Sequence, residues 1–293
     1  MLPFMLAVAL GVAPIQRVEV ALAETLLVTA HGDGAPVVLV PGLFGSAYGW
    51  RKVVSLLAAS GRRTIVIEPL AIGGSARPRG ADYSLTAQAD RIATVLDILG
   101  VREAVVVAHS TAGGMVFRMA VRRPELVRAV VSLDGGPSET AATPGFRRAM
   151  SFAPLIRMVG SAGLRGRVRS SLVRASGDPA WVTDEAIARY TEGATADFGA
   201  TLLAFMAMAG SHEPMALAPR LAEVRCPVFL LVGEAPHGGR VSEREIALLR
   251  HEVVGFTLEM VPGAGHYLQE ERPDVVAAAV ERALGTVATV ARR

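Results

Sequence analysis

The sequence predicts an α/β protein with a doubly wound, mostly parallel β-sheet and an inserted helical cap. Short apolar, β-branched runs alternate along the chain with stretches of helical periodicity, which is the pattern of consecutive βαβ units. Several of these runs are apolar on both faces, as strands inside a helix-covered parallel sheet are. One long segment, residues 138–215, breaks the alternation because it contains no convincing strand.

The strands are expected to begin at the edge of the sheet and to continue as buried runs. Residues 17–20 alternate polar and apolar side chains, and residues 26–29 form a short run before the turn His31-Gly32-Asp33-Gly34. Buried strands are predicted at residues 36–40, 64–68, 104–108, 129–133 and 228–233, and a further strand near residues 256–261.

Helices are expected between these strands. Residues 82–99 have Ser84 or Thr86 as an N-cap and Gly100 as the end of the helix. The other helices of the core are predicted at residues 50–59, 113–121, 242–250 and 273–284. In sheets of this kind a ligand binds outside the carboxyl ends of the strands, so functional residues are expected in the loops that follow them.

The insertion is predicted to consist of helices at residues 146–159, 163–175, 184–190 and 198–209. The chain is therefore divided into a first part of the core (24–137), a helical cap (138–215) and a second part of the core (216–293). Methionines of the cap could line an adaptable apolar pocket or simply fill space between cap and core. They are Met150, Met158, Met206, Met208 and Met215.

Arginine is concentrated in the first half of the cap. The residues, with no Asp or Glu between them, are Arg147, Arg148, Arg157, Arg165, Arg167, Arg169 and Arg174. The simplest interpretation is a solvated helix face, and the alternative is attraction of an anionic substrate or surface.

Composition excludes several classes of protein. Of 293 residues, 51% are hydrophobic and 19% charged, which fills a deep core and argues against disorder. The net charge of +3 is small, and the sequence has neither a basic, aromatic-interleaved patch nor a zinc spacing, so no nucleic-acid partner is expected. The single cysteine, Cys226, rules out an intramolecular disulfide and a Cys-based metal cluster. No cofactor or metal is expected.

The N-terminal segment, residues 1–23, has two interpretations. Residues 2–12 are apolar but too few to span a bilayer, and Ala21-Leu22-Ala23 resembles a signal-peptide cleavage site. The absence of Lys or Arg before the apolar run and the strand pattern at 17–20 favour an ordinary N-terminal extension. Cytoplasmic and exported locations both stay open, no stable membrane insertion of the mature chain is expected, and the oligomeric state is open.

Ser110 is the candidate nucleophile. It follows the buried run of residues 104–108 directly and precedes a helical pattern, and its neighbours Ala108 and Ala112 are small. A tight strand-to-helix turn pushes its serine outward and needs small flanking residues, whereas the simpler alternative is an N-cap serine.

The candidate base is His266, because it lies in a Gly-rich loop straight after the last predicted strand, at the same edge of the sheet as Ser110. His109 is expected to pack behind the turn rather than to act. The other histidines, His31, His212, His237 and His251, carry no special signal.

Two acids could orient His266. Asp134 follows the predicted strand 129–133, and Glu234 follows the strand 228–233. Asp134 is preferred because its shorter side chain holds an imidazole with less rotamer freedom, and Glu234 stays as the alternative.

Together these residues resemble the α/β-hydrolase superfamily. The resemblance rests on the elbow Ala108-His109-Ser110-Thr111-Ala112, the loop Pro41-Gly42-Leu43, the segment Gly73-Gly74-Ser75-Ala76-Arg77-Pro78 and Gly265-His266. It implies an oxyanion hole made by the backbone N–H groups of Leu43 and Thr111.

The sequence departs from the family pattern at three places. Alanines replace the elbow glycines, Pro41 replaces a histidine, and Pro236 stands where the family usually has an aspartate. The last departure shifts weight to Asp134.

The expected function is a serine hydrolase that cleaves a small, apolar carboxylic ester or related acyl compound through a covalent acyl-enzyme. The resemblance leaves carbon–carbon bond hydrolysis and cofactor-free perhydrolysis open, since both use the same triad. A non-catalytic ligand receptor on the same fold is a further alternative. Epoxide hydrolase chemistry is disfavoured because the resemblance associates it with an aspartate elbow.

Overall fold

The computed structural model describes residues 15–160 and 163–286. Its centre is an eight-stranded sheet in the order β1-β2-β4-β3-β5-β6-β7-β8. The strands are β1 (Ile15–Ala21), β2 (Glu24–His31), β3 (Pro36–Val40), β4 (Arg63–Glu68), β5 (Ala104–His109), β6 (Val127–Leu133), β7 (Val228–Gly233) and β8 (Phe256–Val261). The neighbouring strands from β4 through β3, β5, β6 and β7 to β8 all pair in parallel. The strand β2 pairs antiparallel with both β1 and β4. The predicted doubly wound, mostly parallel sheet is confirmed.

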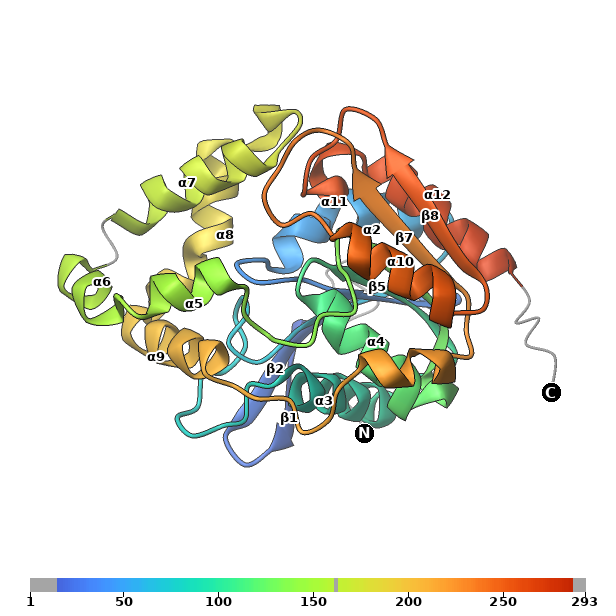
Figure 1. Ribbon diagram of the computed structural model, residues 1–293, viewed down its shortest axis with the longest axis horizontal. Coiled ribbons are helices and arrows are strands. Elements are labelled where there is room, and N and C mark those ends of the chain that lie inside the picture. The colour runs from blue at the N-terminus through green and yellow to red at the C-terminus, as the bar shows by residue number, and fades with distance from the viewer. Residues whose placement is uncertain (1–14, 161–162, 287–293) are drawn as a thin grey trace.

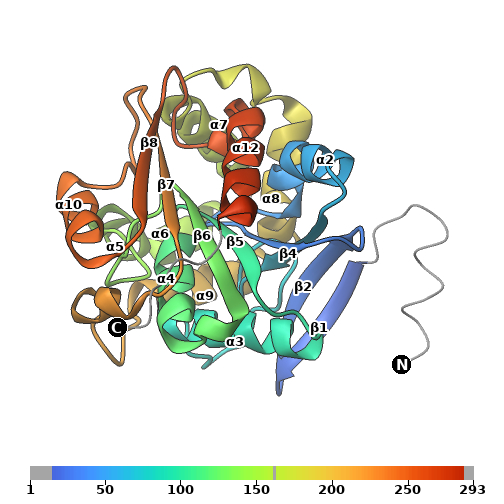
Figure 2. The ribbon, with the colours of Figure 1, turned by 90° about the vertical axis from the view of Figure 1, so that its right-hand side faces the viewer.

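Helices cover both faces of the sheet (Figure 2). One face carries α2 (Arg51–Ala59), which follows a 3₁₀ turn, and α12 (Pro273–Gly285). The other face carries α3 (Leu85–Ile98), α4 (Ala112–Arg122) and α10 (Glu243–Glu252). Ser84 caps α3 by accepting a hydrogen bond from the backbone N–H of Ala87.

The buried strands supply both hydrophobic cores because their side chains alternate between the faces. In β5, Val105 and Val107 pack with α2 and α12, whereas Val106 and Ala108 pack with α3 and α4. All four side chains are fully buried. This two-sided burial explains why the central strands show no polar face in the sequence.

A helical cap lies between β6 and β7 in the chain and forms the left side of the molecule in Figure 1. Its helices are α5 (Pro144–Met150), α6 (Ala153–Val159), α7 (Leu164–Ala175), α8 (Asp184–Ala196) and α9 (Phe198–Ala209). The single helix predicted at 146–159 is divided in two. Pro154 stands in the first turn of α6, where its missing N–H is tolerated, and it cannot continue a helix from α5.

The strand β1 includes the last part of residues 1–23, the segment predicted to be either a signal peptide or an N-terminal extension. β1 pairs with β2 through a hairpin whose turn contains Ala23 at a φ of 62°. The apolar run 2–12 lies outside the described residues, so the alternatives for this segment remain predictions. Within residues 15–160 and 163–286, no helix has the length and apolar character needed to cross a membrane.

Substitution of Gly113 by alanine provides a stability test, because helix propensity would raise the free energy of unfolding and the tight packing at this position would lower it. A Cβ atom at Gly113 would lie 2.7 Å from the backbone of Gly135. We expect Gly113→Ala to lower the free energy of unfolding by about 2 kcal/mol, although alanine is the better helix former.

The matched control is Gly166→Ala in α7, where a Cβ atom meets nothing within 4 Å. It should raise the free energy of unfolding by roughly 0.5–1 kcal/mol. Urea unfolding of both variants measures the difference, and equal effects would contradict the packing argument.

Candidate active site

Ser110 occupies a tight turn between β5 and α4. Its φ is 55°, in the left-handed region that residues other than glycine rarely adopt. The backbone N–H of Ser110 donates to Leu133 O at 2.9 Å, and its own carbonyl accepts from Gly113 N–H at 2.9 Å. These bonds hold the strained turn and leave the side chain half-buried at the carboxyl edge of the sheet.

Glycines outside the Ala108–Ala112 pentapeptide make room for this turn. A Cβ atom at Gly42 would lie 2.6 Å from His109 O, and one at Gly135 would lie 2.6 Å from Ser110 O. The closest approaches to the turn therefore fall on Gly42, Gly113 and Gly135. This explains how alanines are accommodated at 108 and 112, both fully buried.

The structure brings His266 to Ser110 from the loop after β8. The His266 Nε2 atom lies 3.0 Å from the Ser110 Oγ atom. The loop is tied to the cap, because the His266 backbone N–H donates to Ala175 O at 2.7 Å. Burial, followed by the nearby His109 and His237, lowers the pKa of His266 well below its usual 6.5. The ring is therefore neutral at pH 7, with a lone pair available to accept a proton.

His109 packs behind the turn, as predicted. Its Nε2 atom lies 2.9 Å from His266 O, and the two rings are 4.7 Å apart. Burial lowers its pKa to about 4. His109 thus supports the backbone of the His266 loop as a neutral, buried ring.

Of the two candidate acids, Asp134 lies beside His266. Asp134 is buried at the end of β6 with a φ of 45°, and its Oδ2 atom accepts from the Gly233 backbone N–H at 3.2 Å. Its Oδ1 atom and the Nδ1 atom of His266 are buried without a hydrogen-bond partner in the described part of the chain. Glu234, in contrast, is exposed.

His237 was missed by the sequence reasoning. Its Nε2 atom lies 3.4 Å from Asp134 Oδ2, and its ring is 5.4 Å from that of His266. One signal was available in the sequence, since His237 follows the strand β7 and so belongs to a loop at the same edge of the sheet.

Asp134, His237 and His266 are also the described residues best placed to hold a metal ion. One ligand atom from each lies within 4.8 Å of the other two. Imidazole nitrogens and a carboxylate oxygen suit Zn²⁺ and related ions. The Cys226 thiol adds no ligand to this group, because it is buried elsewhere, before β7.

The backbone donors expected from the resemblance lie next to Ser110. The Leu43 N–H donates to the Thr111 Oγ1 atom at 3.1 Å. The Thr111 N–H has no acceptor among residues 15–160 and 163–286. The Thr111 hydroxyl thus occupies the position in which another oxygen atom would accept the Leu43 N–H.

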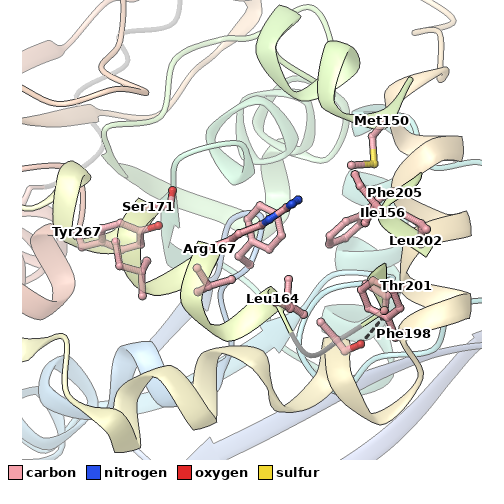
Figure 3. A pocket seen from close by; sticks show the side chains of 16 residues that line it. Met150, Ile156, Leu164, Arg167, Ser171, Phe198, Thr201, Leu202, Phe205 and Tyr267 are labelled. Atoms are coloured by element: carbon pink, nitrogen blue, oxygen red, sulfur yellow. Dashed lines mark hydrogen bonds between the residues drawn. The ribbon is translucent and has the colours of Figure 1, made fainter. Parts of the chain in front are cut away.

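An apolar cavity of about 210 Å³ lies under the cap (Figure 3). Phe44, the neighbour of Leu43, and Tyr267, the neighbour of His266, both line it. Phe44 packs edge-to-face against Phe205 of α9, with ring centroids 5.3 Å apart. Among the cap methionines, Met150 lines the cavity and Met208 is buried in the core.

Comparisons with known proteins agree with this architecture. A family model described as alpha/beta hydrolase fold matches residues 35–154. RutD of Azorhizobium caulinodans, a proposed carbamate hydrolase, is 28% identical over 253 residues, which cover 84% of this chain and 89% of that protein. The meta-cleavage product hydrolase of Pseudomonas fluorescens superposes with a TM-score of 0.74 at 22% identity over 92% of this chain and 98% of that one.

A mouse protein, bifunctional epoxide hydrolase 2, is 36% identical over 104 residues, or 35% of this chain. The aligned part spans only 19% of that relative's length. The sheet, the helical layers and these matches together show that the chain has the α/β-hydrolase fold.

The pKa of Asp134 leads to a test of its environment. Burial, only partly offset by the Gly233 N–H, raises the pKa from 3.8 to about 7. Between these two pH values the unfolded chain has released the proton and the folded chain still holds it. The contribution of Asp134 to the free energy of unfolding is therefore fully present below about pH 4 and is lost as the pH rises to about 7. The amide introduced by Asp134→Asn cannot titrate, so the stability of this variant relative to the unsubstituted protein should rise from pH 4 to pH 7.

Urea unfolding at a series of pH values measures this difference. Glu234→Gln, at the exposed alternative acid, is the control and should give a nearly constant difference across the range. A constant difference for Asp134→Asn as well would show that its carboxyl is not perturbed as described.

Proposed function

We propose that the protein is a serine hydrolase that cleaves carboxylic esters through a covalent acyl-enzyme. The observation that carries the proposal is the 3.0 Å contact between Ser110 Oγ and His266 Nε2 at a strained strand-to-helix turn. A serine hydroxyl needs an adjacent base to act as a nucleophile at neutral pH, and a neutral His266 supplies one.

In the first half of the reaction, the Ser110 Oγ atom attacks the ester carbonyl as its proton passes to His266 Nε2. The tetrahedral oxyanion accepts hydrogen bonds from the backbone N–H groups of Leu43 and Thr111. To do so it replaces the Thr111 hydroxyl as the acceptor of the Leu43 N–H. His266 then gives the proton to the leaving alcohol. In the second half, water attacks the acyl-serine with His266 as base, and the carboxylic acid leaves.

Asp134 is proposed as the residue that orients His266. The unpartnered Asp134 Oδ1 and His266 Nδ1 support this role, because a small side-chain rotation would join two buried polar atoms that otherwise lack partners. An imidazolium formed during the reaction would also favour the ionised carboxylate of Asp134, whose pKa burial raises to about 7.

Hydrolysis of a carbon–carbon bond is the second candidate. It is favoured by the similarity to a meta-cleavage product hydrolase, which is a similarity of fold at 22% identity. Perhydrolysis and a non-catalytic receptor remain alternatives on the same residues. The serine at position 110 argues against epoxide hydrolysis despite the similarity to a segment of a bifunctional epoxide hydrolase.

The first activity test is a series of p-nitrophenyl esters with Ser110→Ala and His266→Ala. Each substitution should lower kcat/KM by roughly four to six orders of magnitude, because nucleophile and base act as a unit. Circular dichroism of both variants checks that the fold is retained. Unchanged turnover in Ser110→Ala would exclude the proposed mechanism, and absence of turnover in the unsubstituted protein would favour a receptor.

The second test compares the two acids. We expect Asp134→Asn to lower kcat by more than roughly ten-fold, since it removes the charge that stabilises the imidazolium. Glu234→Gln should leave kcat within about two-fold, because its side chain is exposed. The opposite ranking, measured on the same ester, would assign the orienting role to Glu234.

A further inference from the structure

The cavity under the cap contains one side chain that its apolar character does not explain. On α7 the lining residues follow helical spacing: Leu164, Arg167, Val168, Ser171 and Leu172. Residues at such intervals share one face of a helix, and here that face is turned toward the cavity. Arg167 thus stands in the middle of a stripe where an apolar residue would be expected.

Arg167 has no ionic partner in the described part of the protein. Its neighbour Arg169 pairs with Asp184, but no carboxylate lies within 4.0 Å of the Arg167 guanidinium among residues 15–160 and 163–286. Figure 3 shows the guanidinium directed into the cavity. Arg167 is exposed, so water solvates its charge while the cavity holds no ligand, and the unpaired charge costs little free energy.

Arg167 is the only charged residue among the described residues that line the cavity. The other lining side chains are apolar, aromatic or hydroxyl-bearing, and they include Phe198, Phe205 and Thr201. The Thr201 hydroxyl already accepts a hydrogen bond from Arg77 and donates to Asp197 O. A single guanidinium in such surroundings balances one negative charge and matches a planar carboxylate through two parallel hydrogen bonds.

We propose that Arg167 is a specificity-determining residue that binds a carboxylate at the far end of an apolar substrate chain. The chain would extend from Ser110 past Phe44 and Tyr267 and cross the cavity to α7. The natural substrate class is then a half-ester: an ester at one end, an apolar middle and a carboxylate at the other end. This inference rests on the proposed esterase activity for the ester end, whereas carboxylate binding can be measured without turnover.

The binding experiment uses Ser110→Ala protein, which retains the cavity. Monomethyl esters of linear dicarboxylic acids of increasing chain length are titrated by calorimetry, with the dimethyl ester of the same acid as the neutral counterpart. At the best chain length, the monomethyl ester should bind roughly ten-fold more tightly than the dimethyl ester. Arg167→Gln should remove this preference, and Arg167→Lys should restore part of it.

The matched control is Arg165→Gln, which removes the same charge from the exposed side of the same helix without touching the cavity. It should retain the preference for the monomethyl ester. If Arg165→Gln and Arg167→Gln reduce binding equally, the effect comes from the overall positive charge of the cap, and the specific site is excluded. A preference that persists in Arg167→Gln, or no preference at any chain length, also overturns the proposal.

Turnover by protein with Ser110 intact separates this inference from the proposed function. Loss of carboxylate recognition in Arg167→Gln should raise KM for the half-ester with little change in kcat, whereas Arg165→Gln should leave both constants unchanged. If Ser110→Ala leaves turnover unchanged, the proposed function fails, yet the calorimetric comparison still decides whether Arg167 binds a carboxylate.

Discussion

The left-handed backbone at Ser110 is the constraint on which the rest of the site depends. A residue held in this conformation costs on the order of 1–3 kcal/mol, and it persists only where neighbouring structure fixes it. Here the fixing contacts are the bond from Ser110 N–H to Leu133 O and the close approach of Gly135 to the turn. The parallel pairing of β5 with β6 provides both, so the sheet itself holds the proposed nucleophile in place.

The cap and the core are joined at the histidine rather than only through apolar packing. Ala175, the last residue of α7, accepts the His266 backbone N–H. The Glu271 carboxylate accepts backbone N–H groups from Gly177 in the cap and Gly265 in the core. The helix that carries Arg167 is therefore also the helix whose end supports the proposed base. A ligand held at α7 would be positioned relative to His266 through a short, hydrogen-bonded connection.

Burial is the largest influence on the protonation states of the site. It lowers the pKa values of His109 and His266 and raises that of Asp134, so neutral forms are favoured in the resting protein. Such a site is suited to chemistry in which charge develops only during the reaction, since low polarity then strengthens each interaction with that charge. The cavity is apolar as well, and the one charged residue named in its lining is Arg167.

The amino-acid sequence alone determined the strand and helix order, because two-sided burial and helical spacing are local patterns, and it placed Ser110, Asp134 and His266 at one edge because parallel strands end together. It favoured Asp134 over Glu234 but left both open, since both follow neighbouring strands and only the fold buries one and exposes the other. The roles of His237 and Arg167 could not be separated from those of neighbouring residues either, although the position of His237 after β7 pointed to the same edge of the sheet. Their roles depend on which way a loop folds and which face of α7 meets the cavity, and those are decided by packing between segments far apart in the chain.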